Sequence, residues 1–364
     1  MKQNAPLLFY INSLHRGGAQ RVMVQLAGRF AASGRRVILL TSYREKDEYP
    51  VPDGVERLSI EDEQIRQDAL RRNLSRIRAL RSLCKTERPA ALIAFMAEPN
   101  IRAVLAARGL GVPVIISVRN DPEKEYFNPV FRFAARHLLP EADFCVFQTE
   151  RARRWFDEKL QKKSAVIMNQ VDERFFDRPS CPERHDIVAV GRLTAQKNHA
   201  LLLRAYAALG PAEDRLVIYG EGEKRGELEE LARKLHLADR VLLPGVRDDI
   251  PEAIGGAKLF VLPSDYEGMP NALLEAMALG LACIAADCPC GGPAELIENG
   301  KNGLLIPVGD EAALTAALRR LLDNETERTA LALAARERAE AFRPETVFRQ
   351  WEACVQAVID GKES

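Results

Sequence analysis

The chain has 364 residues, of which 47% are hydrophobic and 29% charged, and its formal net charge is zero. This length suits two domains better than one, and the apolar content is sufficient for two cores. No apolar run approaches the roughly 18 residues of a transmembrane helix, and the run at 7–11 is too short for a signal peptide. Seven cysteines without paired spacing predict reduced, mostly buried thiols in a cytoplasmic protein.

Apolar strands and helical patterns alternate through the first part of the chain. The alternation predicts βαβ units and a parallel sheet. The predicted strands are residues 7–11, 37–41, 91–95, 114–118, 144–147 and 165–168, and the predicted helices include 19–32, 64–88, 100–107 and 128–138.

Two loops of this first part follow predicted strands and carry candidate ligand-binding residues. Gly17 and Gly18 precede the first helix, where glycines let a ligand approach the backbone at a helix N-terminus. A plain tight turn explains these two glycines equally well. Arg119 and Asn120 directly follow the strand at 114–118 and can donate hydrogen bonds to a ligand.

Positive charge is concentrated in the first part of the chain. Residues 1–170 contain 29 Lys and Arg against 19 Asp and Glu, and the remainder contains 23 against 33. The helix at 64–88 has a basic face with Arg71, Arg72 and Arg76, which suits an anionic membrane surface or a lipid diphosphate. A packed helix with a solvated basic face fits the pattern as well. No zinc-finger or aromatic RNA-binding pattern accompanies the charge, so nucleic acid is not an expected partner.

A polar stretch after residue 169 interrupts the alternation, which then restarts. Further strands are predicted at 187–190, 216–219, 241–243, 258–262 and 283–285, with helices at 200–208, 225–235, 271–279, 311–341 and 343–359. The fold class is therefore α/β, with two doubly wound, Rossmann-like domains spanning residues 1–170 and 171–344. Ligands of such domains bind at the carboxyl ends of the strands, here expected in a cleft between the domains.

Two loops of the second domain deliver charged side chains at strand ends. Arg192 and Lys197 follow the strand at 187–190 and together suit a diphosphate, although most arginines and lysines are simply exposed. Val246 follows the strand at 241–243, where backbone groups can contact a base.

The stretch at 263–280 reads as a strand end, a tight loop and a helix. Amides of Gly268, Met269 and Asn271 would lie at the helix N-terminus and favour an oxyanion. Glu267 and Glu275 flank this loop and could hold hydroxyl groups, which suggests a sugar phosphate or a nucleotide. An ordinary strand-to-helix turn with two solvated carboxylates would show the same local pattern.

The whole pattern resembles one protein family. Glu-Gly-Met-Pro-Asn-Ala-Leu-Leu-Glu at 267–275 resembles the E-x7-E signature of retaining glycosyltransferases of family 4. Further matches occur in the family's order at 17–21, 191–198, 220–222, 243–245, 291–295 and 303–305. The resemblance implies the two-domain GT-B fold, in which the last helix, within residues 345–364, crosses back to the first domain.

The resemblance also implies roles for individual residues. Gly17 and Gly18 would lie against the donor diphosphate, which Arg192 and Lys197 would neutralise in place of a metal ion. The donor loop would comprise Gly268, Met269, Pro270 and Asn271, with Glu275 on the ribose hydroxyls, Glu267 near the donor sugar and Val246 near the base. Many relatives have a histidine where this chain has the stretch ending in Arg119 and Asn120. We therefore place Asn120 with Glu267, Arg192 and Lys197 as catalytic candidates and leave the catalytic base open.

The expected activity is retaining transfer of a hexose or N-acetylhexosamine from a UDP-sugar to a polyprenyl-diphosphate-linked saccharide. No metal or other cofactor is expected, and the chain is placed at the cytoplasmic face of the membrane, with Arg71, Arg72, Arg76 and Arg119 toward the acceptor or the lipid. Two alternatives stay open. One is a nucleotide-sugar epimerase on a related fold, and the other is a non-enzymatic basic module that binds membrane or nucleic acid.

Overall fold

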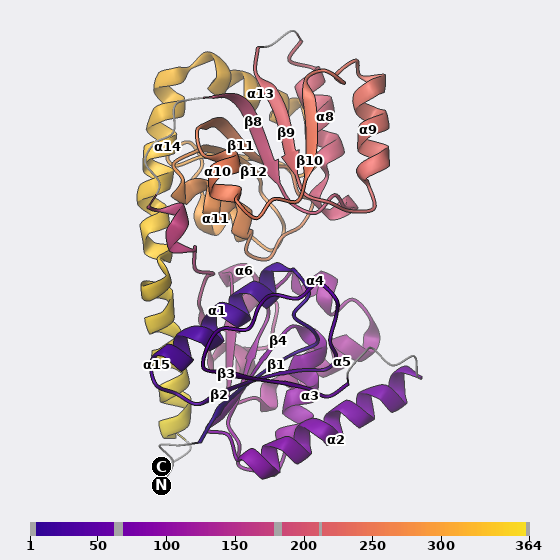
Figure 1. Ribbon diagram of the computed structural model, residues 1–364, viewed down its shortest axis with the longest axis vertical. Helices are drawn as coiled ribbons and strands as arrows, with labels where there is room; N and C mark the ends of the chain where they lie inside the picture. Colours follow the sequence, from indigo (N-terminus) through magenta and orange to yellow (C-terminus); the bar gives the residue numbers. More distant parts are fainter. Residues whose placement is uncertain (1–4, 62–67, 178–183, 211–212, 362–364) are drawn as a thin grey trace. The chain divides into compact units, whose positions relative to one another are not determined.

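The computed structural model describes residues 5–61, 68–177, 184–210 and 213–361 (Figure 1). The chain divides into two compact units. Unit 1 comprises Met1–Asn169 and Glu345–Ser364, and unit 2 comprises Gln170–Pro344. The boundary expected after residue 170 falls one residue from this division. Each unit contains one parallel sheet with helices, so the predicted α/β class is confirmed.

Unit 1 contains a seven-stranded parallel sheet in the order β3-β2-β1-β4-β5-β6-β7. Its strands are β1 (Leu7–Ile11), β2 (Val37–Thr41), β3 (Val55–Ser59), β4 (Ala91–Phe95), β5 (Val114–Ser117), β6 (Phe144–Phe147) and β7 (Ser164–Val166). Four of these strands, β1, β2, β4 and β5, are buried throughout, which explains their continuous apolar sequence. Strand β3 was not predicted, because it lies at the sheet edge and includes polar residues.

The helices of unit 1 include its C-terminal segment. They are α1 (Gly18–Ala32), α2 (Ala69–Glu87), α3 (Ala97–Ala107), α4 (Pro122–Glu125), α5 (Pro129–His137), α6 (Glu150–Arg154), α7 (Glu158–Gln161) and α15 (Pro344–Gly361), with a short 3-10 turn at Leu139–Glu141. On α15, Phe348 packs against Phe30 with ring centroids 5.0 Å apart, and Trp351 packs against Phe95 at 5.6 Å. The return of the last helix to the first domain is therefore confirmed.

Unit 2 contains a six-stranded parallel sheet in the order β10-β9-β8-β11-β12-β13. Its strands are β8 (Arg184–Val190), β9 (Arg215–Tyr219), β10 (Val241–Gly245), β11 (Ala257–Leu262), β12 (Ala282–Ala286) and β13 (Leu304–Ile306). Its helices are α8 (His199–Ala207), α9 (Arg225–Lys234), α10 (Ile250–Ile254), α11 (Asn271–Ala278), α12 (Gly292–Leu296), α13 (Glu311–Asp323) and α14 (Glu325–Ala339), with 3-10 turns at Glu173–Phe175, Ala195–Lys197 and Glu340–Phe342.

One predicted helix of unit 2 is wrong in its length. The pattern at 311–341 was expected to form one helix, but the structure divides it between α13 and α14 at Asn324. The Asn324 side chain accepts a hydrogen bond from the Glu327 amide at 3.1 Å and so caps the second helix.

The strand orders place the ligand-binding edges of both sheets. Consecutive strands run outward on either side of β1 and β4 in unit 1, and of β8 and β11 in unit 2. At such switch points the following loops separate and leave a crevice at the carboxyl ends of the strands. No helix within the described ranges is long and apolar enough to cross a membrane. The six cysteines within the described residues are buried, as predicted.

Candidate functional site

The candidate residues of unit 2 converge at its topological switch point. Arg192 and Lys197 follow β8, and Glu267 and Glu275 follow β11, its neighbour in the sheet. Because the two strands are parallel, their carboxyl ends lie at one edge and both loops extend from it. The structure thus brings together side chains that are up to 83 positions apart in the sequence (192 to 275).

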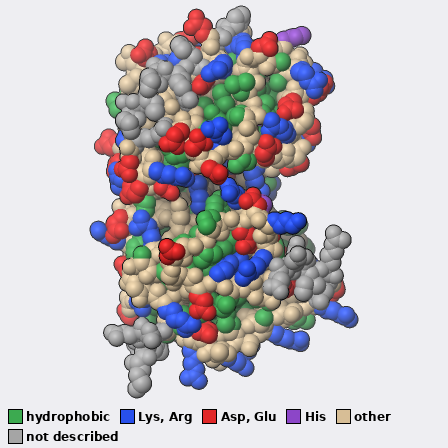
Figure 2. Space-filling view, viewed as in Figure 1, with side chains coloured by type: hydrophobic (Ala, Val, Ile, Leu, Met, Phe, Trp, Pro, Cys, Tyr) green, Lys and Arg blue, Asp and Glu red, His purple; other side chains and the backbone are tan. Residues whose placement is uncertain are grey.

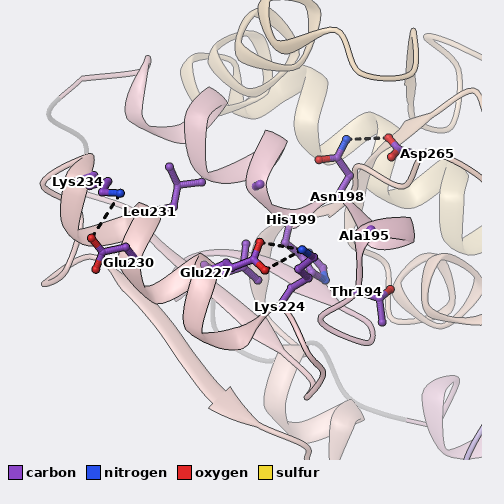
Figure 3. A pocket seen from close by; sticks show the side chains of 12 residues that line it. Thr194, Ala195, Asn198, His199, Lys224, Glu227, Glu230, Leu231, Lys234 and Asp265 are labelled. Atoms are coloured by element: carbon purple, nitrogen blue, oxygen red, sulfur yellow. Dashed lines mark hydrogen bonds and ion pairs between the residues drawn. The ribbon is translucent and has the colours of Figure 1, made fainter.

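Three hydrogen bonds, besides the pair of Lys197 and Glu267, join these two loops in the described structure. The Asp265 amide donates to the Gln196 carbonyl at 2.9 Å, and the Gln196 side chain donates to the Tyr266 carbonyl, also at 2.9 Å. The Asn198 side-chain amide donates to the Asp265 carboxylate at 2.7 Å (Figure 3). Lys197 lies between two residues that make these bonds, so its backbone is held against the β11 loop.

Lys197 and Glu267 form an ion pair at this junction. The Lys197 ammonium lies 2.5 Å from Oε1 of Glu267, and the Ser264 hydroxyl donates to the same oxygen at 2.7 Å. The Lys197 and Glu267 side chains are 15% and 8% exposed, so solvent screens their attraction only weakly. In contrast, Arg192 is exposed and has no ion-pair partner within the described part of the chain. The site therefore contains one cation that is already positioned and one that can reorient.

Glycines allow the edge loops to pack backbone against backbone. A Cβ added at Gly292 would lie 1.7 Å from the carbonyl oxygen of Gly268, and one at Gly220 would lie 2.0 Å from that of Gly191. Neither position can accept a side chain without a backbone shift, because the neighbour in each case is main chain. The loops after β8, β9, β11 and β12 are therefore in direct contact.

The N-terminus of α11 provides backbone donors beside Glu267. Pro270 precedes the helix, and the amides of Gly268 and Met269 donate no hydrogen bond to any residue that the structure describes. The helix dipole makes this position favourable for an anion. Glu275 is 6% exposed and sits in the second turn of α11. Val246 is 60% exposed in the loop after β10.

A pocket of about 560 Å³ lies beside the same loops, between α8 and α9 (Figure 3). Thr194, Asn198 and Asp265 line it together with His199, but Arg192, Lys197, Glu267 and Glu275 do not. His199 is 3% exposed, and burial lowers its pKa to about 4, with a smaller contribution from the charge of Lys197. Its imidazole is therefore neutral at pH 7.

The candidates of unit 1 lie at the equivalent edge of its sheet. Gly17 precedes α1 and Gly18 is its first residue, both following β1. Asn120 is partly exposed in the loop after β5. Met96, just after β4, has a φ of 78°, a strained conformation for a bulky residue that no sequence pattern indicated.

Two arginines expected to face an acceptor or a membrane are buried instead. Arg76 is 1% exposed and donates two hydrogen bonds to Glu61, at 2.8 and 2.7 Å. Arg119 is 7% exposed, donates to Asn169, and lies over the Phe95 ring at 4.6 Å. The expectation that Arg76 belongs to a surface basic face is therefore wrong, whereas the role of Arg119 toward the acceptor stays a prediction. The spacing of arginines along residues 64–88 predicts a basic helix face, but it does not indicate which arginine has a carboxylate partner in the core, as Arg76 has in Glu61.

The remaining two arginines of that group, Arg71 and Arg72, lie on α2. Arg71 is exposed and Arg72 is half-buried. Sequence analysis also missed Gln196 and Ser264, which position Lys197 and Glu267. No local pattern marks a glutamine or a serine for such a role, because the partners come from different loops.

Each of the two units matches a known protein family. Residues 17–168 match the family described as "Glycosyl transferase 4-like domain", and residues 170–338 match "Glycosyl transferases group 1". The two matches together span nearly the whole chain. The chain therefore belongs to the group 1 glycosyltransferases with a glycosyltransferase 4-like first domain, as its motifs predicted.

Three relatives illustrate the similarity. One relative, from Campylobacter jejuni, is named GalNAc-α-(1→4)-GalNAc-α-(1→3)-diNAcBac-PP-undecaprenol α-1,4-N-acetyl-D-galactosaminyltransferase. It is 28% identical to this chain over 94% of this chain and 96% of its own length. An exopolysaccharide phosphotransferase of Streptomyces coelicolor is 34% identical over 62% of this chain, which spans only 24% of that protein. HepE of Anabaena, solved with UDP, has a TM-score of 0.82 at 19% identity, covering 96% of this chain and 99% of that one. The last likeness confirms the GT-B fold.

Proposed function

We propose that the chain transfers a hexose or N-acetylhexosamine from a UDP-sugar to a hydroxyl of a polyprenyl-diphosphate-linked saccharide, with retention at the anomeric carbon and without a metal ion. The observation that carries the proposal is the ion pair of Lys197 with Glu267 at the switch point of unit 2, with Arg192 exposed on the same loop as Lys197. The named substrate of the Campylobacter relative supports the acceptor class. The UDP complex of the structural neighbour supports the nucleotide.

The donor site is assigned to the edge loops of unit 2. Lys197 and Arg192 neutralise the diphosphate, since a positioned ammonium and a reorienting guanidinium both suit phosphate oxygens. The amides of Gly268 and Met269 add uncharged donors at the helix N-terminus. Glu275 accepts from the ribose hydroxyls.

The sugar and the acceptor use the remaining candidates. Glu267 orients the donor sugar through its hydroxyls, and Val246 contacts the base. Gly17 and Gly18 are assigned to the donor diphosphate by the family resemblance of their loop, and Asn120 donates a hydrogen bond to the acceptor.

Transfer then exchanges two carbon–oxygen bonds. The bond between the anomeric carbon and the diphosphate oxygen breaks, and the acceptor oxygen bonds to the same face of the sugar. The acceptor proton passes to the leaving diphosphate, so no protein nucleophile is required. Stabilisation of the departing charge by Lys197 and Arg192 is the main catalytic contribution of the protein.

Nucleotide binding tests the donor site. Thermal unfolding is measured with UDP, GDP and ADP for the wild type, Lys197→Ala and Glu275→Ala, with Arg233→Ala, whose side chain is 65% exposed on α9, as the control for loss of a cation. A ligand at a hundred times its dissociation constant adds about 2.7 kcal/mol of stability. We expect a shift with UDP in the wild type and the control that is lost in both site variants. Absence of a shift with every nucleotide would overturn the proposal.

Product analysis tests the reaction. The purified chain is incubated with UDP-N-acetylgalactosamine, UDP-N-acetylglucosamine or UDP-glucose and a polyprenyl-diphosphate disaccharide, with and without EDTA. We expect an axial linkage by NMR and an unchanged rate in EDTA. Epimerised UDP-sugar formed without acceptor would instead identify an epimerase, and salt-sensitive DNA binding without nucleotide affinity would identify a binding module.

The proposed location is the cytoplasmic face of the membrane, where a lipid-linked acceptor is accessible to a peripheral protein. Cell fractionation before and after a high-salt wash measures it. We expect the chain in the membrane fraction at low salt and partial release at high salt, because attraction to anionic lipids is screened.

A further inference from the structure

Helix α5 carries an apolar stripe that faces solvent. Phe127, just before the helix, is 66% exposed, and Val130 and Phe133 within it are 75% and 61% exposed. The spacing of three residues places Val130 and Phe133 on one face of the helix, and Phe127 is exposed just before the N-cap Asn128. Ala134 and Ala135 form the buried face of the same helix. Unlike an ordinary amphipathic helix, α5 thus exposes the large apolar side chains of Val130 and Phe133 and buries the small ones of Ala134 and Ala135.

Cations flank the stripe. Arg132 and Arg136 are exposed on the same helix, four residues apart, and the Arg136 guanidinium is 4.0 Å from Asp157, too far for a strong ion pair. The His137 ring packs on Phe133 with centroids 4.6 Å apart. Figure 2 shows how widely lysine and arginine side chains are distributed over the visible face of the molecule.

A hollow of about 570 Å³ adjoins the stripe. Arg132, Phe133, Arg136 and Trp155 line it, together with the acidic residues Glu123 and Asp157. Trp155 stacks on Tyr126 at 5.8 Å, so its indole is fixed in place. Tryptophan is the residue most characteristic of the boundary between lipid and water.

We propose that α5 inserts its stripe of Phe127, Val130 and Phe133 into an anionic bilayer while Arg132 and Arg136 contact the lipid headgroups. A helix of nine residues is too short to span a bilayer, but an apolar stripe flanked by arginines is the pattern of an interfacial helix. The excess of cations in residues 1–170, 29 against 19, favours an anionic surface over a neutral one. The inference extends the proposed function by naming the element that contacts the membrane.

This assignment moves the membrane contact away from the basic face of α2. On α2 the central arginine of that face, Arg76, is buried in an ion pair. Only Leu70 and Leu74 of its apolar residues are strongly exposed, at 68% and 44%. On α5, in contrast, both arginines and all three residues of the stripe are exposed.

Vesicle sedimentation tests the proposal without depending on transfer activity. The probes are vesicles of phosphatidylcholine alone and of phosphatidylcholine with about 30% phosphatidylglycerol. The variants are Val130→Ser with Phe133→Ser, and Arg132→Glu with Arg136→Glu. Leu333→Ser, which removes an equally exposed leucine (66%) from α14 in unit 2, is the matched control, and Leu70→Ser with Leu74→Ser tests α2.

We expect the wild type, the control and the α2 variant to bind the anionic vesicles alike, and the serine variant of α5 to lose about tenfold or more in partitioning. The glutamate variant should lose its preference for anionic lipid. The fluorescence of Trp155 should shift to the blue on binding, since the other tryptophan, Trp351, is already buried.

Equal binding of the wild type and the α5 serine variant would overturn the proposal, as would absence of vesicle binding by the wild type. Conversion of a wild-type dimer into a monomer by the serine variant, without vesicle binding, would assign the stripe to a second copy instead. The UDP-induced thermal shift is measured on the same variants. If the α5 serine variant keeps the UDP-induced thermal shift but no longer binds vesicles, its donor site is intact and the loss is specific to membrane binding.

Discussion

Gly292→Ala should damage the donor site through backbone contact alone. The added Cβ would lie 1.7 Å from the Gly268 carbonyl oxygen, 2.8 Å from its carbonyl carbon and 3.1 Å from Cδ of Pro270. Favourable contacts between such atoms lie near 3.5 Å, so the Gly268 backbone must move by about 1.5 Å or more. That backbone directly follows Glu267 and provides one of the two amides at the start of α11.

The cost follows from known overpacking. Inserting a methylene into a packed core costs about 1–3 kcal/mol, and the backbone neighbour here places Gly292→Ala near 3 kcal/mol. For a unit of this size, about 1 kcal/mol lowers Tm by 2–4 °C, so the midpoint of unit 2 should fall by about 6–12 °C. Gly226→Ala is the matched control, because a Cβ at this exposed position of α9 would meet no atom within 4 Å. Helix propensity predicts a gain of up to about 1 kcal/mol for that control.

Thermal unfolding by circular dichroism, repeated with UDP, measures both effects. We expect Gly292→Ala to melt early and to lose its UDP shift, while Gly226→Ala melts at or above the wild-type midpoint and keeps the shift. If Gly292→Ala melted within about 1 °C of the wild type and bound UDP normally, the close packing of these loops would be refuted.

Three further predictions concern buried ionisable groups. Arg76→Ala should destabilise unit 1 by about 3–5 kcal/mol in urea unfolding because it leaves Glu61 buried without its cation, whereas Arg78→Ala, at an exposed site of α2, should change stability by less than about 0.5 kcal/mol. Burial lowers the pKa of His199 to about 4, so between pH 6.5 and 4 the unfolded state binds a proton that the folded state does not. The free energy of unfolding should therefore fall by about 3 kcal/mol as the pH drops through this range. His199→Leu should flatten this pH dependence, and an unchanged dependence would contradict the assignment. Burial raises the pKa of Glu125 to about 8, so the folded state retains the proton and the free energy of unfolding should fall as the pH rises from 4.5 to 8. Glu125→Gln should remove this fall in stability. If the variant still showed the fall, another group would be responsible.

The sequence was sufficient for the architecture because the strands are apolar runs separated by helical periodicity. Lys197 and Glu267 could be placed at strand ends because each follows a predicted strand, and parallel strands share one carboxyl edge. The strand orders that create the switch points come from the structure. The edge strand β3 was missed, since its polar residues weaken the pattern. Asn324 was also missed as a helix cap inside a continuous helical periodicity.

Side-chain partners could not be predicted in the same way. Arg76 belongs to a run of exposed arginines by composition, and only the fold shows that Glu61 lies beside it in the core. The stripe on α5 was likewise read as an ordinary helix, because periodicity gives the apolar face of a helix but not whether the protein covers it. Val130 and Phe133 lie at the surface because no other element within the described residues covers this face of α5.

The two cations of the donor site differ in the entropy that ligand binding would cost. Lys197 is already held by Glu267, and the residues on either side of it are bonded to the β11 loop, so its rotamers are restricted before any ligand arrives. Arg192 is exposed and would lose its side-chain freedom only on binding, at about 0.5–1.5 kcal/mol. A diphosphate would also compete with Glu267 for the ammonium, and displacement would free a carboxylate oxygen that the Ser264 hydroxyl still contacts. On this argument Lys197 provides preorganisation and coupling to Glu267, whereas Arg192 provides charge that can follow the departing diphosphate.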